Sequence, residues 1–399
     1  MSAATLPDHI RRPHVRLFQM MGAQHNGQQV VVLRDPMALS SQMMAVPPQA
    51  VMVIQQFQGE RTIEEIASGL KAPDSAPFIE LAKRLDEVGL LWGPTFERLE
   101  GELKAKLKET GYFPAGGTQQ PTPDQIRGAL AGWLAQTEDP ELDGSPVAIV
   151  APHLDYPRGW PNYAAAYRCL DRCETPDRVV ILGTNHFGIG DGVVLTELGF
   201  ETPIAMVAPD TKVIDRLKAL IGDAGFVDQL DHHAEHSIKL HLPWIQHRFG
   251  DVPVVAALVP DPLVGMLAAD EKRTSTTQFL DSMNEALDAV GGRTLFVSSA
   301  DLSHVGPQFG EPRPVDAQRK VDVERVDRDL MAAYLSGDPD VFLARARETR
   351  NPTRWCSIGN MHAVLALAKP SAVEMIDYRQ ACDEQGNCLV SSAALALMG

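Results

Sequence analysis

Short apolar runs alternate with amphipathic segments through most of the chain after residue 140. Continuous runs rich in Val, Ile, Leu and Ala lie at 147–150, 179–182, 254–259 and 294–297. Runs of this length and composition are typical of strands that are buried on both faces of a sheet. Between them, segments such as 211–225 and 275–292 carry apolar residues at helical spacing. The alternation predicts a layered α/β domain.

The first hundred residues show a different pattern, which predicts a small separate unit. Residues 28–36 have the pattern of a strand closed by a turn, and residues 49–60 that of an apolar helix. Thr62 with Glu65 forms the capping box of a second helix. A third apolar stripe follows at 78–91. Helices of this kind followed by Gly-Leu-Leu-Trp suggest a winged-helix module.

A change in composition indicates where the two parts separate. A charged helical segment at 97–110 leads into residues 111–123, where Gly, Pro, Thr and Gln accumulate and the chain is expected to be irregular. We place the boundary just before that stretch. The sequence therefore predicts a winged-helix-like domain over 1–100 and an α/β domain over 108–399.

Composition and charge restrict the class of partner more than they restrict the fold. The chain has 399 residues, 44% of them hydrophobic, which is enough to bury a large core. Its formal net charge of −16 repels phosphate backbones and disfavours nucleic acid as a partner. The first residues lack the apolar region of a signal peptide, and no uncharged apolar run reaches the ~18 residues of a membrane helix. We therefore expect a soluble, cytoplasmic protein that does not bind membranes.

The cysteines do not indicate a disulfide scaffold. Their number is odd, and the two closely spaced pairs lack the two-residue spacing of a zinc knuckle. The five are Cys169, Cys173, Cys356, Cys382 and Cys388. We interpret them as reduced thiols that are buried or on the surface.

Three histidines follow three of the predicted strands closely. His153 comes just after the run 147–150, His186 just after 179–182, and His304 soon after 294–297. In open α/β sheets, ligands bind in the crevice at the carboxyl ends of the strands. Neutral imidazole is the commonest side-chain ligand of metals. The three positions together predict a shared metal site.

A fourth cluster of titratable residues spans 231–236. His232 to His236 has the spacing H-x-x-E-H of inverted zincins, in which two histidines on one helix bind zinc. No apolar helical face precedes His232, and Pro243 limits any helix that follows, so the zincin interpretation is disfavoured. The adjacent pair Glu235 and His236 is better suited to general acid/base chemistry near a metal.

The order of these motifs resembles a known family. Pro152-His153, the segment 181–186, Glu235-His236 and the segment 298–304 occur with separations similar to those of the Memo family, whose bacterial members are called AmmeMemoRadiSam system protein B. The likeness runs from about Gly111 to near the C-terminus. The first hundred residues lie outside it and resemble the PqqD-like family of peptide-binding winged-helix domains, which implies recognition of a peptide by strand addition.

The Memo resemblance implies a fold similar to class III extradiol dioxygenases, which use non-haem iron. By this resemblance His153 and His186 match metal ligands, and His236, accompanied by Glu235, matches an acid/base histidine. The animal protein has a cysteine as third ligand, which we match to Ser303. The third ligand is therefore open, with His304 preferred. The further candidates for the site are Asp301, Ser303, Asp155 and His232, Asp155 being a departure from the family's Ala-Gly.

Three functions follow from these features. The first is a redox enzyme with a divalent metal, Fe(II) favoured and copper or zinc as alternatives, acting on an unidentified small molecule or peptide. The second is a module that binds a peptide or protein without catalysis. The family context implies a radical-SAM protein and an AMMECR-type protein as partners. The third is a zinc metallohydrolase in which Glu235 is the base.

Overall fold

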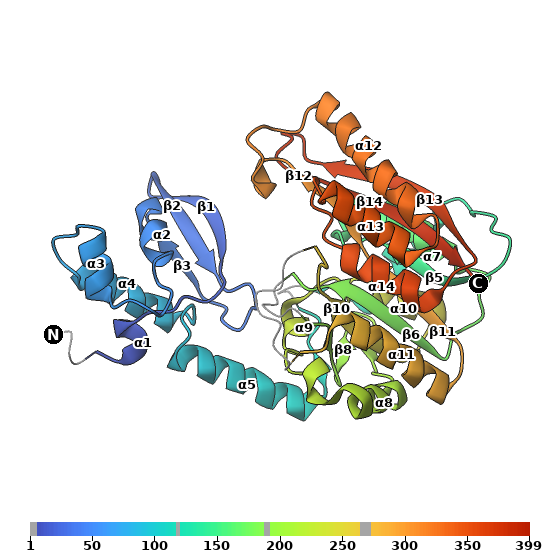
Figure 1. Cartoon of the computed structure of the whole chain (residues 1–399), viewed down its shortest axis with the longest axis horizontal. Helices are drawn as coiled ribbons and strands as arrows, with labels where there is room; N and C mark the ends of the chain where they lie inside the picture. The colour runs from blue at the N-terminus through green and yellow to red at the C-terminus, as the bar shows by residue number, and fades with distance from the viewer. Residues whose placement is uncertain (1–5, 117–119, 187–191, 264–272) are drawn as a thin grey trace. The chain divides into compact units, whose positions relative to one another are not determined.

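The computed structural model describes residues 6–116, 120–186, 192–263 and 273–399. The chain divides into two units, Met1–Gly111 and Tyr112–Gly399 (Figure 1). The charged helix predicted at 97–110 falls in the first unit. The assignment of that unit to the PqqD-like winged-helix family stays a prediction.

The first unit combines a small antiparallel sheet with five helices among its described residues. Its elements are α1 (Asp8–Arg11), β1 (Gln19–His25), β2 (Gln28–Arg34), β3 (Met43–Val46), α2 (Pro48–Ile54), α3 (Ile63–Gly69), α4 (Ala76–Glu87) and α5 (Pro94–Thr110). Strand β2 lies between β1 and β3. The predicted capping box is confirmed: Glu65 N donates to Thr62 Oγ1 at 3.2 Å, and Thr62 N donates to Glu65 Oε2 at 2.7 Å. Leu33, Ile54 and Phe57 are fully buried in its core.

The second unit is a mixed α/β structure, as predicted. Its strands are β4 (Tyr112–Phe113), β5 (Pro146–Ala151), β6 (Arg178–Thr184), β7 (Val194–Leu195), β8 (Gly199–Glu201), β9 (Met206–Val207), β10 (Val254–Val259), β11 (Thr294–Ser299), β12 (Asp301–Val305), β13 (Ala372–Cys382) and β14 (Leu389–Met398). Its helices are α6 (Pro123–Ala135), α7 (Tyr156–Arg168), α8 (Thr211–Ile221), α9 (Asp231–Ala234), α10 (Leu242–Phe249), α11 (Thr276–Val290), α12 (Ala317–Tyr334), α13 (Pro339–Thr349) and α14 (Ile358–Ala368), with short 3₁₀ turns at Gly222–Gly225 and Pro307–Phe309.

The four predicted strands form the centre of one sheet. The order is β12-β14-β5-β11-β6-β10-β7, and β13 pairs with β14 outside this path. Strands β5, β11, β6 and β10 are parallel, whereas β7, β12, β13 and β14 join by antiparallel pairing. The carboxyl ends of β5, β11 and β6 therefore lie side by side at one edge.

Helices cover both faces of this sheet. Alternate residues of β14 belong to different clusters: Leu395 and Leu397 pack in the large core with residues of α8, α11 and α14, while Ala396 and Met398 pack against Cys169 at the end of α7. Since successive side chains of a strand point to opposite faces, α7 lies on the face opposite to α14. The continuous apolar runs of the sequence thus correspond to strands buried on both sides.

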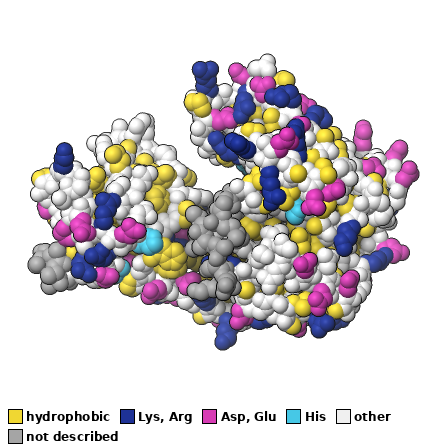
Figure 2. Space-filling model, viewed as in Figure 1, with side chains coloured by type: hydrophobic (Ala, Val, Ile, Leu, Met, Phe, Trp, Pro, Cys, Tyr) yellow, Lys and Arg dark blue, Asp and Glu magenta, His cyan; other side chains and the backbone are white. Residues whose placement is uncertain are grey.

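The surface carries charges of both signs. Figure 2 shows acidic and basic side chains interspersed on the visible face. No helix within the described residues is long and apolar enough to cross a membrane.

Candidate metal centre

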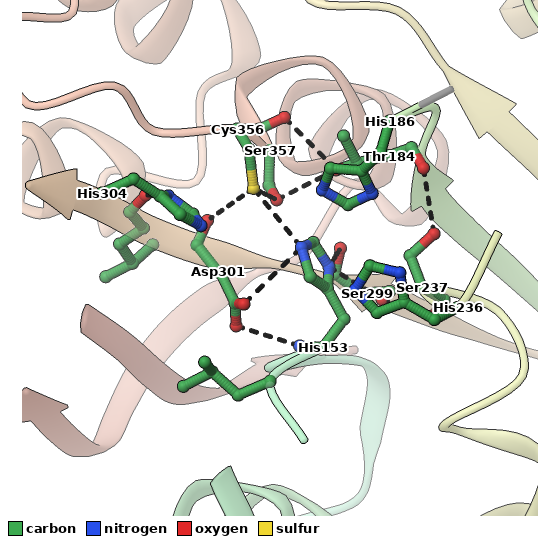
Figure 3. Close-up of polar contacts among 12 residues, drawn as sticks. His153, Thr184, His186, His236, Ser237, Ser299, Asp301, His304, Cys356 and Ser357 are labelled. Atoms are coloured by element: carbon green, nitrogen blue, oxygen red, sulfur yellow. Dashed lines mark hydrogen bonds and ion pairs between the residues drawn. The ribbon is translucent and has the colours of Figure 1, made fainter. Parts of the chain in front are cut away.

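Two histidines enter the site directly after central strands. His153 follows β5 and His186 follows β6, the two strands that flank β11. His236 comes from the segment after α9, which ends at Ala234 as the backbone of Glu235 becomes extended. Figure 3 shows the three rings pointing toward one another. The crevice at the carboxyl edge therefore assembles imidazoles that lie far apart in the sequence.

The three imidazoles are close enough to share an ion. Among the described residues, His153, His186 and His236 form the one group of three in which a ligand atom of each lies within 4.8 Å of the others. Their ring centroids are 4.9–5.5 Å apart. The ring of His153 is buried, whereas the side chain of His236 is 45% exposed. The cluster thus reaches from the interior to solvent.

Hydrogen bonds orient two of these rings in the same way. His153 Nδ1 lies 3.0 Å from the carbonyl oxygen of Ser299. A carbonyl only accepts, so Nδ1 carries the proton and Nε2 keeps its lone pair. His186 Nδ1 lies 3.1 Å from both carboxylate oxygens of Glu235. When the ring is neutral, its proton is therefore on Nδ1, and Nε2 keeps its lone pair. Such outer partners are characteristic of metal-binding histidines.

Glu235 is a buried positioning group. Its carboxylate also accepts hydrogen bonds from the backbone N–H groups of His186, His236 and Ser237, each at 2.8 Å. Burial opposes its ionisation, but the hydrogen bond and charge of His186, with these donors, lower the pKa to about 2. Glu235 therefore stays ionised and ties the segment after α9 to the segment after β6.

Cys356 is the site residue that sequence reasoning missed. Its Sγ lies 3.3 Å from His153 Nε2 (Figure 3). Its thiol is also one of the groups that raise the pKa of His186. It precedes α14 rather than following a strand, so the pattern that revealed the histidines could not reveal it. The feature of the sequence that could have indicated Cys356 is the pair Cys356-Ser357, which stands directly before an apolar helix. A soft sulfur ligand is thus added to the imidazoles.

Asp301 contributes a carboxyl group beside His153. Its Oδ1 accepts a hydrogen bond from His153 N at 3.0 Å, and its Oδ2 lies 3.6 Å from His153 Nε2. Burial raises its pKa to about 7. Asp301 is therefore present at the site, as the sequence suggested.

The protonation of the histidines differs within the cluster. Burial, with the neighbouring imidazoles, lowers the pKa of His153 well below 6.5. Burial also lowers the pKa of His236. Burial has the same tendency at His186, but hydrogen bonds with Cys356 and Glu235 outweigh it and raise its pKa well above 6.5. A metal that binds here would displace a proton from His186.

His304, which the sequence suggested as the third ligand, is not part of the group of three imidazoles among the described residues. His304 lies on β12, where its Nδ1 is 3.0 Å from Leu302 O and 3.2 Å from Arg354 O. Burial lowers its pKa to about 4.

Three further candidates have partners outside the cluster. Ser303 is fully buried and its Oγ donates to Asp327, so it does not supply the ligand that we matched to it. His232 is fully buried, with Nε2 3.1 Å from Val194 O. Asp155 caps α7 and pairs with Arg158. The structure therefore gives Ser303, His232 and Asp155, the possible additional site residues, partners outside the group of three imidazoles.

The zincin interpretation also fails on geometry. Helix α9 contains His232 but ends before Glu235 and His236, so the two histidines do not share a helical face. The structure therefore agrees with the sequence analysis, which disfavoured an inverted zincin site here.

The donors present fit a metal ion. Two oriented Nε2 atoms, a third imidazole, a thiol and a carboxyl group converge, and the two inner histidines have fixed hydrogen-bond partners behind them. Nitrogen and sulfur ligands of this kind suit iron, copper and zinc rather than magnesium or calcium.

Comparisons with known proteins relate the second unit to one family. A family model described as Memo-like protein matches residues 114–397. The chain is 26% identical over 327 residues to a MEMO1 family protein of Thermus thermophilus, covering 80% of this chain and 94% of that protein. It is 25% identical over 311 residues to one of Aquifex aeolicus, covering 76% and 79%. A relative from Pyrobaculum aerophilum is 30% identical over 204 residues, covering 49% and 67%.

Proposed function

The chain belongs to the Memo-like family, and we propose from this premise that its histidine cluster binds a divalent metal, Fe(II) by preference, for redox chemistry of the dioxygenase type. The observation that carries the proposal is the shared orientation of His153 and His186. Each ring is held through Nδ1 by a partner from another element, which leaves Nε2 for an ion.

We assign His153, His186 and Cys356 as the residues that hold the ion. Two imidazoles and one carboxylate are the usual protein ligands of non-haem iron, and here the Cys356 thiol stands in place of the carboxylate, which makes copper the main alternative. The bound ion would supply one-electron chemistry with dioxygen or substrate. The half-exposed His236 faces the same space, with Nδ1 3.3 Å from Glu235 Oε1, and we assign it the movement of a proton to or from substrate.

The test is the binding of nitric oxide to the anaerobic Fe(II) protein. An open coordination position on the ion predicts an iron–nitrosyl signal in electron paramagnetic resonance, present in wild type and in His236→Gln. The signal should be lost in the His153→Ala/His186→Ala double variant. Iron that binds at this site but forms no nitrosyl adduct would contradict the proposed redox role.

The hydrolase alternative receives no support from the contacts of Glu235. A general base needs a free oxygen near the reacting water. Both oxygens of Glu235 are occupied by His186 and backbone N–H groups, and its pKa of about 2 makes it a weak base.

A second candidate function is peptide or protein binding by the first unit. A groove of about 360 Å³ lies between α2 and α4, beside the end of strand β3. Its lining is mainly apolar: Val46, Pro47, Ala50, Val53, Pro77, Phe78, Glu80, Leu81 and Arg84. Within the described residues β3 is an edge strand that pairs with β2 alone, and an edge strand is where a peptide can be added as a further strand. The candidate partners are those that the Memo family context implies, a radical-SAM protein and an AMMECR-type protein.

Calorimetric titration of each purified partner into the full chain tests this second function. Binding that is weakened at least tenfold by Leu81→Asp and that survives chelation of the metal would support it. Binding that is unchanged by Leu81→Asp, or abolished by chelation, would contradict a role of this groove.

A further inference from the structure

A buried carboxylate, Asp327, is hydrogen-bonded to Trp355, the residue before Cys356. Asp327 on α12 is fully buried, and within the described residues it has no basic partner. Its Oδ1 accepts from Ser303 Oγ and, at 2.7 Å, from Trp355 Nε1. Its Oδ2 accepts from Tyr378 OH at 2.7 Å and from Ser391 Oγ at 2.5 Å. Four donors thus use the full acceptor capacity of a carboxylate.

Burial of a charged carboxylate is unfavourable, so its presence in the core indicates a specific role for Asp327. An ionised carboxylate loses its hydration on burial, and well-packed apolar residues would stabilise a core at least as well. The four donors come from β12, β13, β14 and the segment before α14. Asp327 therefore joins the antiparallel edge of the sheet to the segment that carries Cys356.

Trp355 connects this carboxylate to the metal centre, because it directly precedes Cys356. Its side chain is buried and its Nε1 donates to Asp327. Its backbone is held at the same time: Trp355 N donates to Asn351 Oδ1 at 2.7 Å, and Asn351 Nδ2 donates to Trp355 O at 2.9 Å. On the other side, Thr184 Oγ1 from β6 donates to Cys356 O at 3.2 Å.

The backbone around Trp355 would not keep this shape by itself. Asn351 and Arg354 have φ of 49° and 61°, in the left-handed region that side chains disfavour. Such backbone conformations are unfavourable and persist where their surroundings fix them. The Asn351 clamp and the Asp327 anchor are the contacts that fix them here.

We propose that Asp327 is a positioning residue for the metal centre, which acts through Trp355 to hold the Cys356 thiol against His153 and His186. The inference rests on the proposed function, since it gives Cys356 the role of a ligand. It concerns only the placement of the thiol, and the two histidines have their own partners, Ser299 and Glu235.

Cobalt binding to the full chain tests this placement spectroscopically. A thiolate ligand gives Co²⁺ a charge-transfer absorption that imidazole ligands do not give, and Cys356→Ser identifies the contribution of this thiol. We expect Trp355→Phe and Asp327→Asn to weaken that absorption and to lower Co²⁺ affinity by about 10–100-fold, the usual effect of losing an outer partner. General destabilisation without displacement of the thiol would not remove the charge-transfer band.

The chain offers a matched control in Trp244. Trp244 is equally buried, and its Nε1 has no hydrogen-bond partner within the described residues. Trp244→Phe makes the same chemical change, and we expect it to leave the cobalt spectrum unchanged. If Asp327→Asn does not fold, the spectrum of Trp355→Phe alone tests the positioning role, because that variant leaves the carboxylate in place.

The cobalt experiment distinguishes failure of the positioning role of Asp327 from failure of the metal site. Wild-type intensity and affinity in both Trp355→Phe and Asp327→Asn would overturn the positioning role while leaving the metal site intact. A wild-type protein that binds Co²⁺ without thiolate absorption would overturn the assignment of Cys356, and the positioning role with it. A wild-type protein that binds no Co²⁺ would contradict the metal site itself.

Discussion

At the scale of single residues, close approaches explain why the segment after α9 can reach the cluster. Gly183 on β6 lies against Ser237, whose Oγ donates to Thr184 O at 3.0 Å. Ser299 Oγ in turn donates to Ser237 O at 2.6 Å. These contacts hold Ser237, and with it Glu235 and His236, against β6, which delivers His186, and against its neighbour β11.

Gly183→Ala should therefore damage the site. An added Cβ would lie 2.4 Å from Ser237 Oγ, so the segment must move. We expect a loss of about 1–3 kcal/mol in the free energy of unfolding, measured by urea denaturation, and weaker metal binding, measured by titration. Gly128→Ala is the control, because Gly128 lies in α6 with open space around it, and should be neutral or slightly stabilising. Equal effects of the two changes would contradict this explanation.

The sequence revealed some site residues and concealed others for identifiable reasons. His153 and His186 were predictable because each directly follows a continuous apolar strand. His304 follows a strand too, yet the chain continues as β12 and carries it away from the group of three. Cys356 was not predictable in this way, because its position depends on the tertiary contacts of Trp355 and Thr184.

At the scale of elements, the start of α7 shows how a charged residue near the site has a structural role. Asp155 is the N-cap of α7: its Oδ1 accepts from Arg158 N at 3.2 Å, and its Oδ2 accepts from Arg158 Nε at 2.8 Å. An N-cap satisfies a backbone donor that the helix leaves without a partner. This explains a carboxylate two residues after His153 without a metal contact.

Asp155→Ala should then destabilise the helix but spare the metal. Loss of the cap predicts a decrease of about 1 kcal/mol in the free energy of unfolding, followed by circular dichroism in urea. Asp155→Asn keeps the capping oxygen and should retain most of that stability. Both variants should bind metal like wild type. A drop in metal affinity in both variants would indicate that Asp155 takes part in metal binding.

The central strands of the large sheet were predictable from the sequence, whereas the strands at its antiparallel edge were not. The runs at 147–150, 179–182, 254–259 and 294–297 became β5, β6, β10 and β11 because a strand buried on both faces must be apolar throughout. Strand β14 is equally buried but contains Ser391 and Ser392. Ser391 is tolerated because Asp327 accepts its hydrogen bond, a pairing that only the folded structure creates.

At the scale of the whole molecule, buried neutral histidines make stability depend on pH. His241 is fully buried, with Nδ1 3.0 Å from Tyr167 OH, and burial lowers its pKa to about 3. The unfolded chain binds a proton at this residue below about pH 6.5, whereas the folded chain does not until about pH 3. Stability must therefore fall as the pH falls through this window, by about 1.4 kcal/mol per pH unit.

His241→Gln should reduce this dependence. Urea denaturation at pH 7.5 and pH 5.0 should show a difference between the two conditions that is smaller by about 2 kcal/mol in the variant. Identical pH dependence in both proteins would contradict the burial of a neutral imidazole at this position.

The two units have separate cores, so the second should fold independently. Leu33, Ile54 and Phe57 belong to the core of the first unit, and Val180, Val255 and Leu395 to that of the second. We expect a chain that begins at Tyr112 to show cooperative unfolding and the metal stoichiometry of the full protein. Loss of cooperativity or of metal in that chain would contradict the division.

The metal content of the anaerobically purified protein tests the central claim most directly. Elemental analysis should find about one iron or copper ion per chain in wild type. The His153→Ala/His186→Ala double variant, confirmed as folded by circular dichroism, should retain less than about a tenth of that amount. Equal metal content in the two proteins would contradict the assignment of this cluster as the metal centre.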